Sequence, residues 1–149
     1  RAIGRTATGV RGISIEEDDE VVGMICVKNN PDDPANILVV SENGFGKQSS
    51  IDDYRITSRG AKGVKTINIT DKTCDLIAIK KVSDDNDLMI INKSGITIRV
   101  PVSDIRLAGR ATQGVKLINL REGDTIAAVC VVNKSEDKVV ETQETTEEL

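Results

Sequence analysis

The sequence predicts an all-β fold built from repeated units. A motif at Ser58 to Ile69 returns 51 residues later as Gly109 to Leu120, and it occurs 54 residues earlier as Gly4 to Ile15. A period near 50 residues is typical of bladed or stacked architectures, in which each unit buries its apolar face against the next. With one Phe, one Tyr and no Trp, the core must come from Val, Ile, Leu and Ala. β-Branched residues favour strands, and stripes with a helical period are hard to find.

The three occurrences share the pattern Arg-x-x-x-Gly-Val-(Lys/Arg)-x-Ile. We call them copy 1 (residues 4–15), copy 2 (58–69) and copy 3 (109–120). Each copy divides into a polar arm that contains Gly and a tail whose apolar residues alternate as in a strand.

Residues 36–83 are predicted to form the first complete unit. Its expected strands are Ile37–Ser41, Phe45–Ser49, Gly63–Ile69 and Leu76–Val82. Glu42-Asn43-Gly44 has the composition of a hairpin turn, and Ile51–Tyr54 is expected to form a short helical turn.

Residues 84–133 repeat this order as a second complete unit. Its expected strands are Asp87–Asn92, Ile96–Val100, Gly114–Leu120 and Thr125–Val132, with a short turn at Val102–Ile105. Each unit is therefore expected to supply four strands of its own.

Residues 1–35 are predicted to form a partial unit, because the chain opens in the middle of a repeat and reads as a fragment. Val21–Val27 is a strand-like run, and the prolines and Asx residues of Lys28–Asn36 favour a loop. At the other end, residues 134–149 are acidic and short of apolar side chains, so we expect a disordered tail.

The charges are segregated within each repeat. The formal net charge is −4, but the last fifteen residues carry −5, whereas segments 1–12, 44–66 and 95–117 each carry +3. A sign pattern that recurs in every repeat indicates an electrostatic field that serves a partner.

Several function classes are disfavoured by composition. The absence of histidine removes Ser-His and Cys-His catalysis and most zinc sites. Carboxylates cluster in turns, where solvated charge is the simpler interpretation, and Gly44-Phe45-Gly46-Lys47-Gln48 is not a phosphate-binding loop. Tyr54 aligns with Ile105, so its position favours packing over a covalent role. An enzyme is thus the weakest interpretation, and no cofactor is expected within the chain.

The sequence also bears on the cellular compartment of the protein and on the state of its cysteines. No run of 18 apolar residues and no leader are seen, so a cytoplasmic location is expected. The three cysteines, Cys26, Cys74 and Cys130, lie far apart in or beside apolar runs, and we expect buried free thiols.

Basic residues persist at aligned positions while their neighbours drift. Arg55 aligns with Arg106, Arg59 with Arg110 and Arg5, and Lys65 with Lys116 and Arg11. A solvated strand face is the alternative interpretation. No aromatic residues interleave with the bases, which favours a duplex backbone over stacked single strands. The candidate DNA-binding residues are Arg5, Arg11, Lys47, Arg55, Arg59, Lys62, Lys65, Arg99, Arg106, Arg110 and Lys116.

These stretches resemble the C-terminal domain of the A subunit of bacterial DNA gyrase. The resemblance rests on residues 3–13, 40–47, 54–64 and 109–124, and it covers residues 1 to about 132. The equivalent domain of topoisomerase IV is the runner-up. The family's Gln-Arg-Arg-Gly-Gly-Lys-Gly box is matched at four of seven positions by residues 57–63, as in a later blade.

The resemblance implies a β-pinwheel of four-stranded blades that exchange strands, with duplex DNA bent around a basic perimeter. It implies that the catalytic tyrosine, ATP and Mg²⁺ act elsewhere in the parent enzyme. The implied partners are DNA, the gyrase B subunit, and the rest of the gyrase A subunit. Unpaired blade edges would permit self-association. The alternative function is a propeller-like protein-interaction scaffold.

Overall fold

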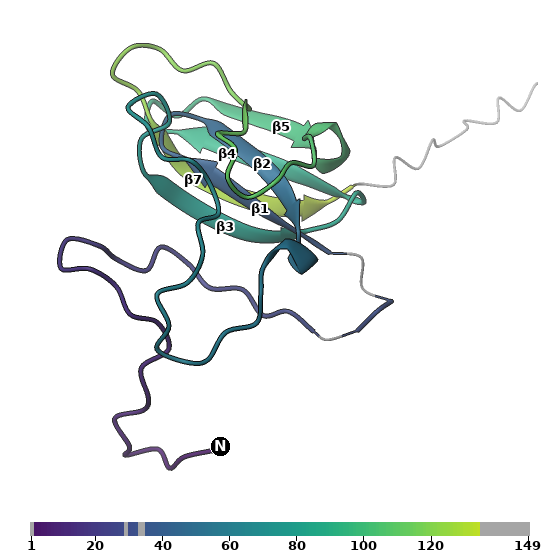
Figure 1. The fold of residues 1–149 in the computed structure, drawn as a ribbon. Helices are drawn as coiled ribbons and strands as arrows, with labels where there is room; N and C mark the ends of the chain where they lie inside the picture. Colours follow the sequence, from purple (N-terminus) through teal and green to yellow (C-terminus); the bar gives the residue numbers. More distant parts are fainter. Residues whose placement is uncertain (1, 29, 33–34, 135–149) are drawn as a thin grey trace, which may run out of the picture.

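The computed structural model describes residues 2–28, 30–32 and 35–134 of the chain. These residues form two antiparallel sheets and two short 3₁₀ turns, with no α-helix among them, so the predicted all-β class is confirmed (Figure 1). No helix in the described ranges is long and apolar enough to cross a membrane. The acidic tail predicted for residues 134–149 lies outside the description from residue 135 onward.

The first sheet has four strands in the order β3-β1-β2-β6. They are β1 (Asn36–Ser41), β2 (Phe45–Ser50), β3 (Leu76–Val82) and β6 (Val115–Lys116). β1 pairs with both β2 and β3, and β6 comes from the following repeat. One unit therefore completes its sheet with a strand from the next.

The second sheet has three strands in the order β5-β4-β7. They are β4 (Asn86–Asn92), β5 (Thr97–Pro101) and β7 (Ile126–Asn133). β4 pairs with β5 on one side and with β7 on the other. By the 51-residue alignment β5 is the counterpart of β2, but no described strand lies on its outer edge.

The expectation that each unit supplies four strands of its own was wrong. Gly63–Ile69 and Val21–Val27 contain no named strand, and the expected strand at Gly114–Leu120 is reduced to β6. The physical reason is that a strand needs a neighbouring strand edge for its backbone hydrogen bonds. Copy 3 pairs with β2 through β6, whereas no strand pairing of the other two segments is found among the described residues.

The two predicted helical turns are confirmed as η1 (Ile51–Asp53) and η2 (Val102–Asp104). The hairpin between β1 and β2 also forms as expected. Gly44 has φ +81°, and its N–H donates to the Ser41 carbonyl at 3.0 Å.

The core divides at β1, because successive side chains of a strand point to opposite faces. Leu38 and Val40 join a cluster with Leu88 and Ile90 of β4, which packs the two sheets together. Ile37, Val39 and Ile67 form a second cluster on the other face, with Tyr54 packed against it. Both faces of β1 are therefore buried, and the packing role predicted for Tyr54 agrees with its place.

Two glycines allow copy 3 to approach β2. Gly114 has φ +82°, and a Cβ there would lie 2.6 Å from the Gly46 carbonyl oxygen. A Cβ on Gly46 would lie 2.5 Å from Leu117 Cδ1. Side chains at these positions would push the two segments apart.

Lys47 was expected to bind DNA, but the structure corrects this assignment. The side chain is 1% exposed, and its ammonium donates to the carbonyls of Gly109, Arg110 and Thr112. Burial lowers the pKa of Lys47, the charge of Arg110 lowers it further, and Asp53 raises it. Lys47 thus holds the arm of copy 3 onto β2, and its ammonium is not free for a phosphate.

The cysteines are unpaired, as expected, but they are not buried. Cys26 and Cys130 are exposed and Cys74 is half-buried. Cys130 follows the buried Val129 in β7 and points to the opposite, open face. Cys26 lies in residues 21–27, which form no strand, and few other residues pack over its side chain.

Replacing Gly114 with alanine should destabilise the fold more than replacing Gly123. Both glycines have positive φ, at +82° and +79°, but a Cβ on Gly123 meets nothing within 4 Å. The contact with Gly46 should cost about 1–3 kcal/mol beyond the shared backbone strain. Urea unfolding of the two variants measures the difference, and equal losses would show that β2 and copy 3 do not meet closely.

Lys47→Met should lower the free energy of unfolding by about 1–3 kcal/mol, because three backbone carbonyls lose a partly buried donor. A folded pKa below the ordinary 10.5 means that the unfolded chain binds more protons in the window between the two values. The contribution of Lys47 to stability therefore rises with pH through that window. Unfolding curves of both chains from neutral pH to pH 10.5 should show a growing difference. A difference that shrinks with pH contradicts this account.

Candidate nucleic-acid interface

The three motif copies contact one another in the same way. The Ser14 N–H donates to the Ala61 carbonyl at 3.0 Å, and the Asn68 N–H donates to the Thr112 carbonyl at 3.0 Å. Ser14 aligns with Asn68, and Ala61 aligns with Thr112. One contact is thus used twice, and it connects the three copies into a continuous series.

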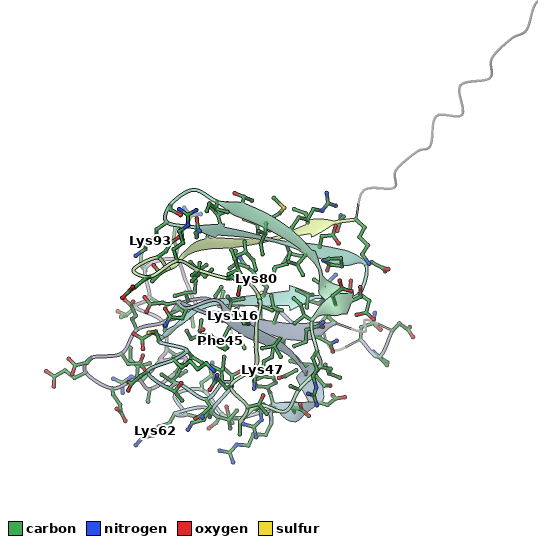
Figure 2. All side chains as sticks on the ribbon, turned by 90° about the horizontal axis from the view of Figure 1, so that it is seen from above. Phe45, Lys47, Lys62, Lys80, Lys93 and Lys116 are labelled. Atoms are coloured by element: carbon green, nitrogen blue, oxygen red, sulfur yellow. The ribbon has the colours of Figure 1, made fainter. Side chains whose placement is uncertain are left out.

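Eight of the predicted DNA-binding side chains are exposed, six on the motif copies and two, Arg55 and Arg106, three residues before copies 2 and 3. They are Arg5, Arg11, Arg55, Arg59, Lys62, Lys65, Arg106 and Lys116. Within the described parts of the chain, none of them forms an ion pair. Figure 2 shows Lys62 at the periphery, away from the sheets. We call these eight residues the basic motif surface.

The other three predicted residues are buried or already engaged by other groups of the protein. Lys47 is buried beneath the arm of copy 3. Arg99 forms an ion pair with Asp87 at 2.6 Å across β5 and β4, so its charge is partly neutralised. Arg110 is half-buried. Its Nη1 donates to the Lys65 carbonyl at 3.0 Å, and its guanidinium lies 5.9 Å from the Tyr54 ring centre.

Arg110 also has a structural role, because its side chain contacts both copy 2 and Tyr54. It joins copy 3 to copy 2, and the Tyr54 hydroxyl makes a hydrogen bond with Thr66 Oγ1 in copy 2. The guanidinium has further N–H groups beyond the one used here. Arg110 therefore positions the basic motif surface as well as contributing charge to it.

Sequence comparison found Lys116 but missed Lys72, and these two lysines lie around Phe45. Lys72 Nζ lies 5.4 Å and Lys116 Nζ 5.8 Å from the ring centre, both within the range of a cation–π contact. The Phe45 ring itself is 6% exposed. Neither ammonium forms an ion pair with a described carboxylate. Two cations beside one ring, neither paired with a described carboxylate, create a positive potential here that attracts anions.

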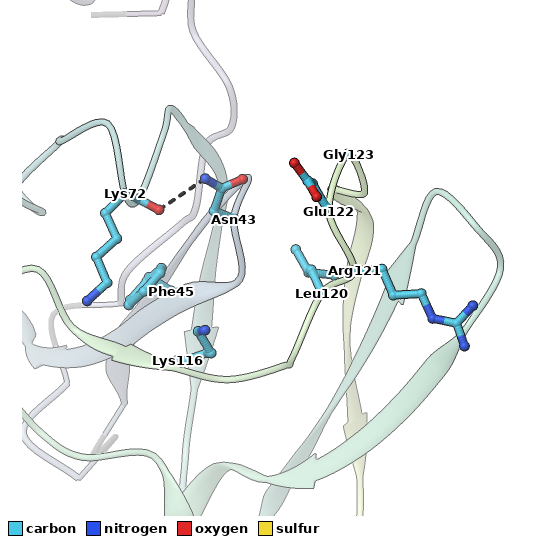
Figure 3. Close-up of a pocket in the computed structure, with 8 residues that line it drawn as sticks. All are labelled: Asn43, Phe45, Lys72, Lys116, Leu120, Arg121, Glu122 and Gly123. Carbon is cyan, nitrogen blue, oxygen red and sulfur yellow. Dashed lines mark hydrogen bonds between the residues drawn. The ribbon is translucent and has the colours of Figure 1, made fainter.

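A cavity of about 280 Å³ opens beside this pair (Figure 3). Asn43 lines it and donates from Nδ2 to the Lys72 carbonyl at 3.0 Å, which fixes the turn that carries Lys72. The guanidinium of Arg121 points away from Phe45 in Figure 3. Lys72 aligns with Gly123, so repeat comparison could not find it. Its position follows from the contact of the 71–75 turn with the β1–β2 hairpin.

The arrangement suits ionic binding to an extended anion. In the ranges that the structure covers, no group of three or more Cys, Asp or Glu side chains could hold a metal. The exposed groups are Lys and Arg side chains spread over several repeats. Such a surface can contact a series of phosphates.

Comparison with known proteins agrees with this architecture. The family model described as the DNA gyrase C-terminal domain, beta-propeller, matches residues 1–28, 35–83 and 86–133. The DNA gyrase A subunit of Staphylococcus aureus strain MRSA252 is 43% identical over 146 residues, and that of strain NCTC 8325 is 44% identical over 147. Each alignment covers 98% of this chain and 16% of the relative, so the chain spans a small part of those proteins.

Solved structures share the fold. The C-terminal domain of DNA topoisomerase IV has a TM-score of 0.73 at 18% identity, covering 83% of this chain and 38% of that one. The DNA gyrase A C-terminal domain has a TM-score of 0.61 at 24% identity, covering 66% and 33%. The family match extends over nearly all of the described residues, and the β-pinwheel expected from the resemblance is borne out. The chain belongs to the DNA gyrase C-terminal domain family.

Proposed function

We propose that the chain binds duplex DNA through its phosphate backbone and bends it along the basic motif surface. The observation that carries this proposal is the set of eight exposed bases on the motif copies and immediately before them, none of which forms an ion pair with a described residue. Cations held at aligned positions of successive repeats suit the regular spacing of phosphates, and phosphate contacts carry little sequence information.

Lys72 and Lys116, the two lysines around Phe45, extend this surface onto the blades. Lys116 belongs to β6 and Lys72 to the turn before β3, so phosphates bound by these two ammonium groups would contact two successive repeats. Bending 20 to 30 base pairs costs on the order of 1–6 kcal/mol, which several such contacts have to offset.

The enzyme in which the chain acts is also proposed rather than shown. We infer that the chain acts as a part of a cytoplasmic type II topoisomerase that introduces negative supercoils, together with the gyrase B subunit, and with the rest of the gyrase A subunit. In this proposal the fragment is not itself catalytic and holds no cofactor. The reactive tyrosine, ATP and Mg²⁺ act in other parts of the parent enzyme.

Affinity for duplex DNA should fall steeply with salt. If about six phosphates are neutralised, the logarithm of affinity should fall against the logarithm of salt concentration with a slope of roughly −5. Fluorescence anisotropy with long and short duplexes of unrelated sequence measures this slope, and the longer duplex should bind more tightly. If the chain binds neither duplex, the alternative of a protein-interaction scaffold is favoured. An affinity that does not change with salt concentration would refute binding to the phosphate backbone.

Arg59→Ala and Lys72→Ala should each weaken duplex binding for every sequence and reduce the size of the salt slope by about 1. Lys134→Ala is the matched control. It removes the same charge from an exposed side chain that donates to the Asp84 carbonyl, outside the motif copies. If the control weakens binding as much as the other two, only the net charge matters and the proposed surface is wrong.

A further inference from the structure

β2 carries three consecutive buried polar side chains. Gln48 is 3% exposed, and its neighbours Lys47 and Ser49 are buried as well. Adjacent side chains of a strand point to opposite faces, so buried polar groups lie on both faces of β2. At the positions aligned with Lys47 and Ser49, β5 has the apolar residues Ile98 and Val100. The polar run is therefore not a general requirement of this strand.

The Gln48 side chain lies among apolar residues. Gln48 is the register partner of Leu38, so it shares the face on which Leu38 joins the cluster between the sheets. Val102 and Ile105 belong to the same cluster. An amide buried there is costly unless it is hydrogen-bonded. Its Oε1 accepts from Asn36 Nδ2 at 3.2 Å, and its Nε2 donates to the carbonyls of Val102 at 2.6 Å and Ile105 at 2.8 Å.

Further hydrogen bonds from β2 hold the backbone around Arg106. The Gln48 N–H donates to the Arg106 carbonyl at 3.3 Å, and the Gln48 carbonyl accepts from the Ala108 N–H at 2.8 Å. Ser49 Oγ donates to the Ala108 carbonyl at 2.8 Å. Residues 102–108 are therefore fixed to β2 from the turn η2 onward.

The side chain of Arg106 takes no part in this attachment. It is exposed and forms no ion pair with a described residue. It belongs to the basic motif surface and lies three residues before copy 3. A charged side chain on a restrained backbone loses less conformational freedom on meeting a phosphate than one on a loose loop. The buried amide of Gln48 thus supports an exposed base.

We propose that Gln48 is a positioning residue for the phosphate contact of Arg106. It holds the Arg106 backbone at the place from which the guanidinium reaches the duplex, and it does not touch the duplex itself. This inference rests on the proposed DNA binding. It names a buried, uncharged residue on which one of the proposed contacts depends.

Gln48→Met tests the proposal, because it keeps the length of the side chain and removes its amide. Affinity for the long duplex should fall about threefold to tenfold, and the size of the salt slope should fall by about 1, as for Arg106→Ala. The substitution changes no charge, so a smaller slope indicates a lost phosphate contact rather than a lower net charge. Fluorescence anisotropy at several salt concentrations measures both values, and circular dichroism verifies the fold.

Double variants separate positioning from a general loss of structure. In an Arg106→Ala chain, Gln48→Met should have no further effect on affinity, whereas in an Arg59→Ala chain it should have its full effect. Ser49→Ala removes only the side-chain bond to the Ala108 carbonyl and serves as the milder variant if Gln48→Met does not fold. It should show the same dependence on Arg106 with a smaller loss of affinity.

The outcomes distinguish this inference from the proposed function. If Arg106→Ala weakens duplex binding and Gln48→Met does not, DNA binding stands and the positioning role is wrong. An effect of Gln48→Met that persists undiminished in the Arg106→Ala chain also overturns the role, as does an Arg106→Ala chain that binds as tightly as the unsubstituted one. If the unsubstituted chain binds no duplex, the proposed function fails and this inference fails with it.

Discussion

The pairing of β6 with β2 is the contact on which the rest of the structure depends. It takes two residues of one repeat and makes them the fourth strand of the sheet of another. Gly46 and Gly114 allow the close approach, and Lys47 secures it with three carbonyl contacts to the arm of copy 3. A buried ammonium is costly unless polar groups surround it, which the arm supplies. The repeats are thereby joined by backbone and side chain together.

The candidate surface follows from this joining. Lys116 reaches Phe45 because β6 lies beside β2, and Arg110 rests on Tyr54 because copy 3 is held next to copy 2. No single repeat contains these contacts. The bases are thus positioned by the order of the repeats, and their individual side chains remain exposed for a partner. In the proposed function the duplex contacts an assembled series rather than one module.

Sequence comparison could predict the fold class, the hairpins and most of the exposed bases, because these depend on patterns within one repeat. It could not predict Lys47, whose burial depends on the carbonyls of residues 109–112 far along the chain. Lys72 lacked a basic counterpart and became visible only beside Phe45. The expected strand at Gly63–Ile69 failed for a related reason, since alternation in sequence makes a strand only where an edge is available.

The central claim is that the stacked motif copies form the DNA-binding surface. Hydrogen–deuterium exchange of the chain with and without a long duplex tests it most directly. We expect slower exchange on DNA binding in the motif copies and in the 71–75 turn, and no change in β7. Protection confined to β7, or no protection at saturating DNA, would contradict the claim.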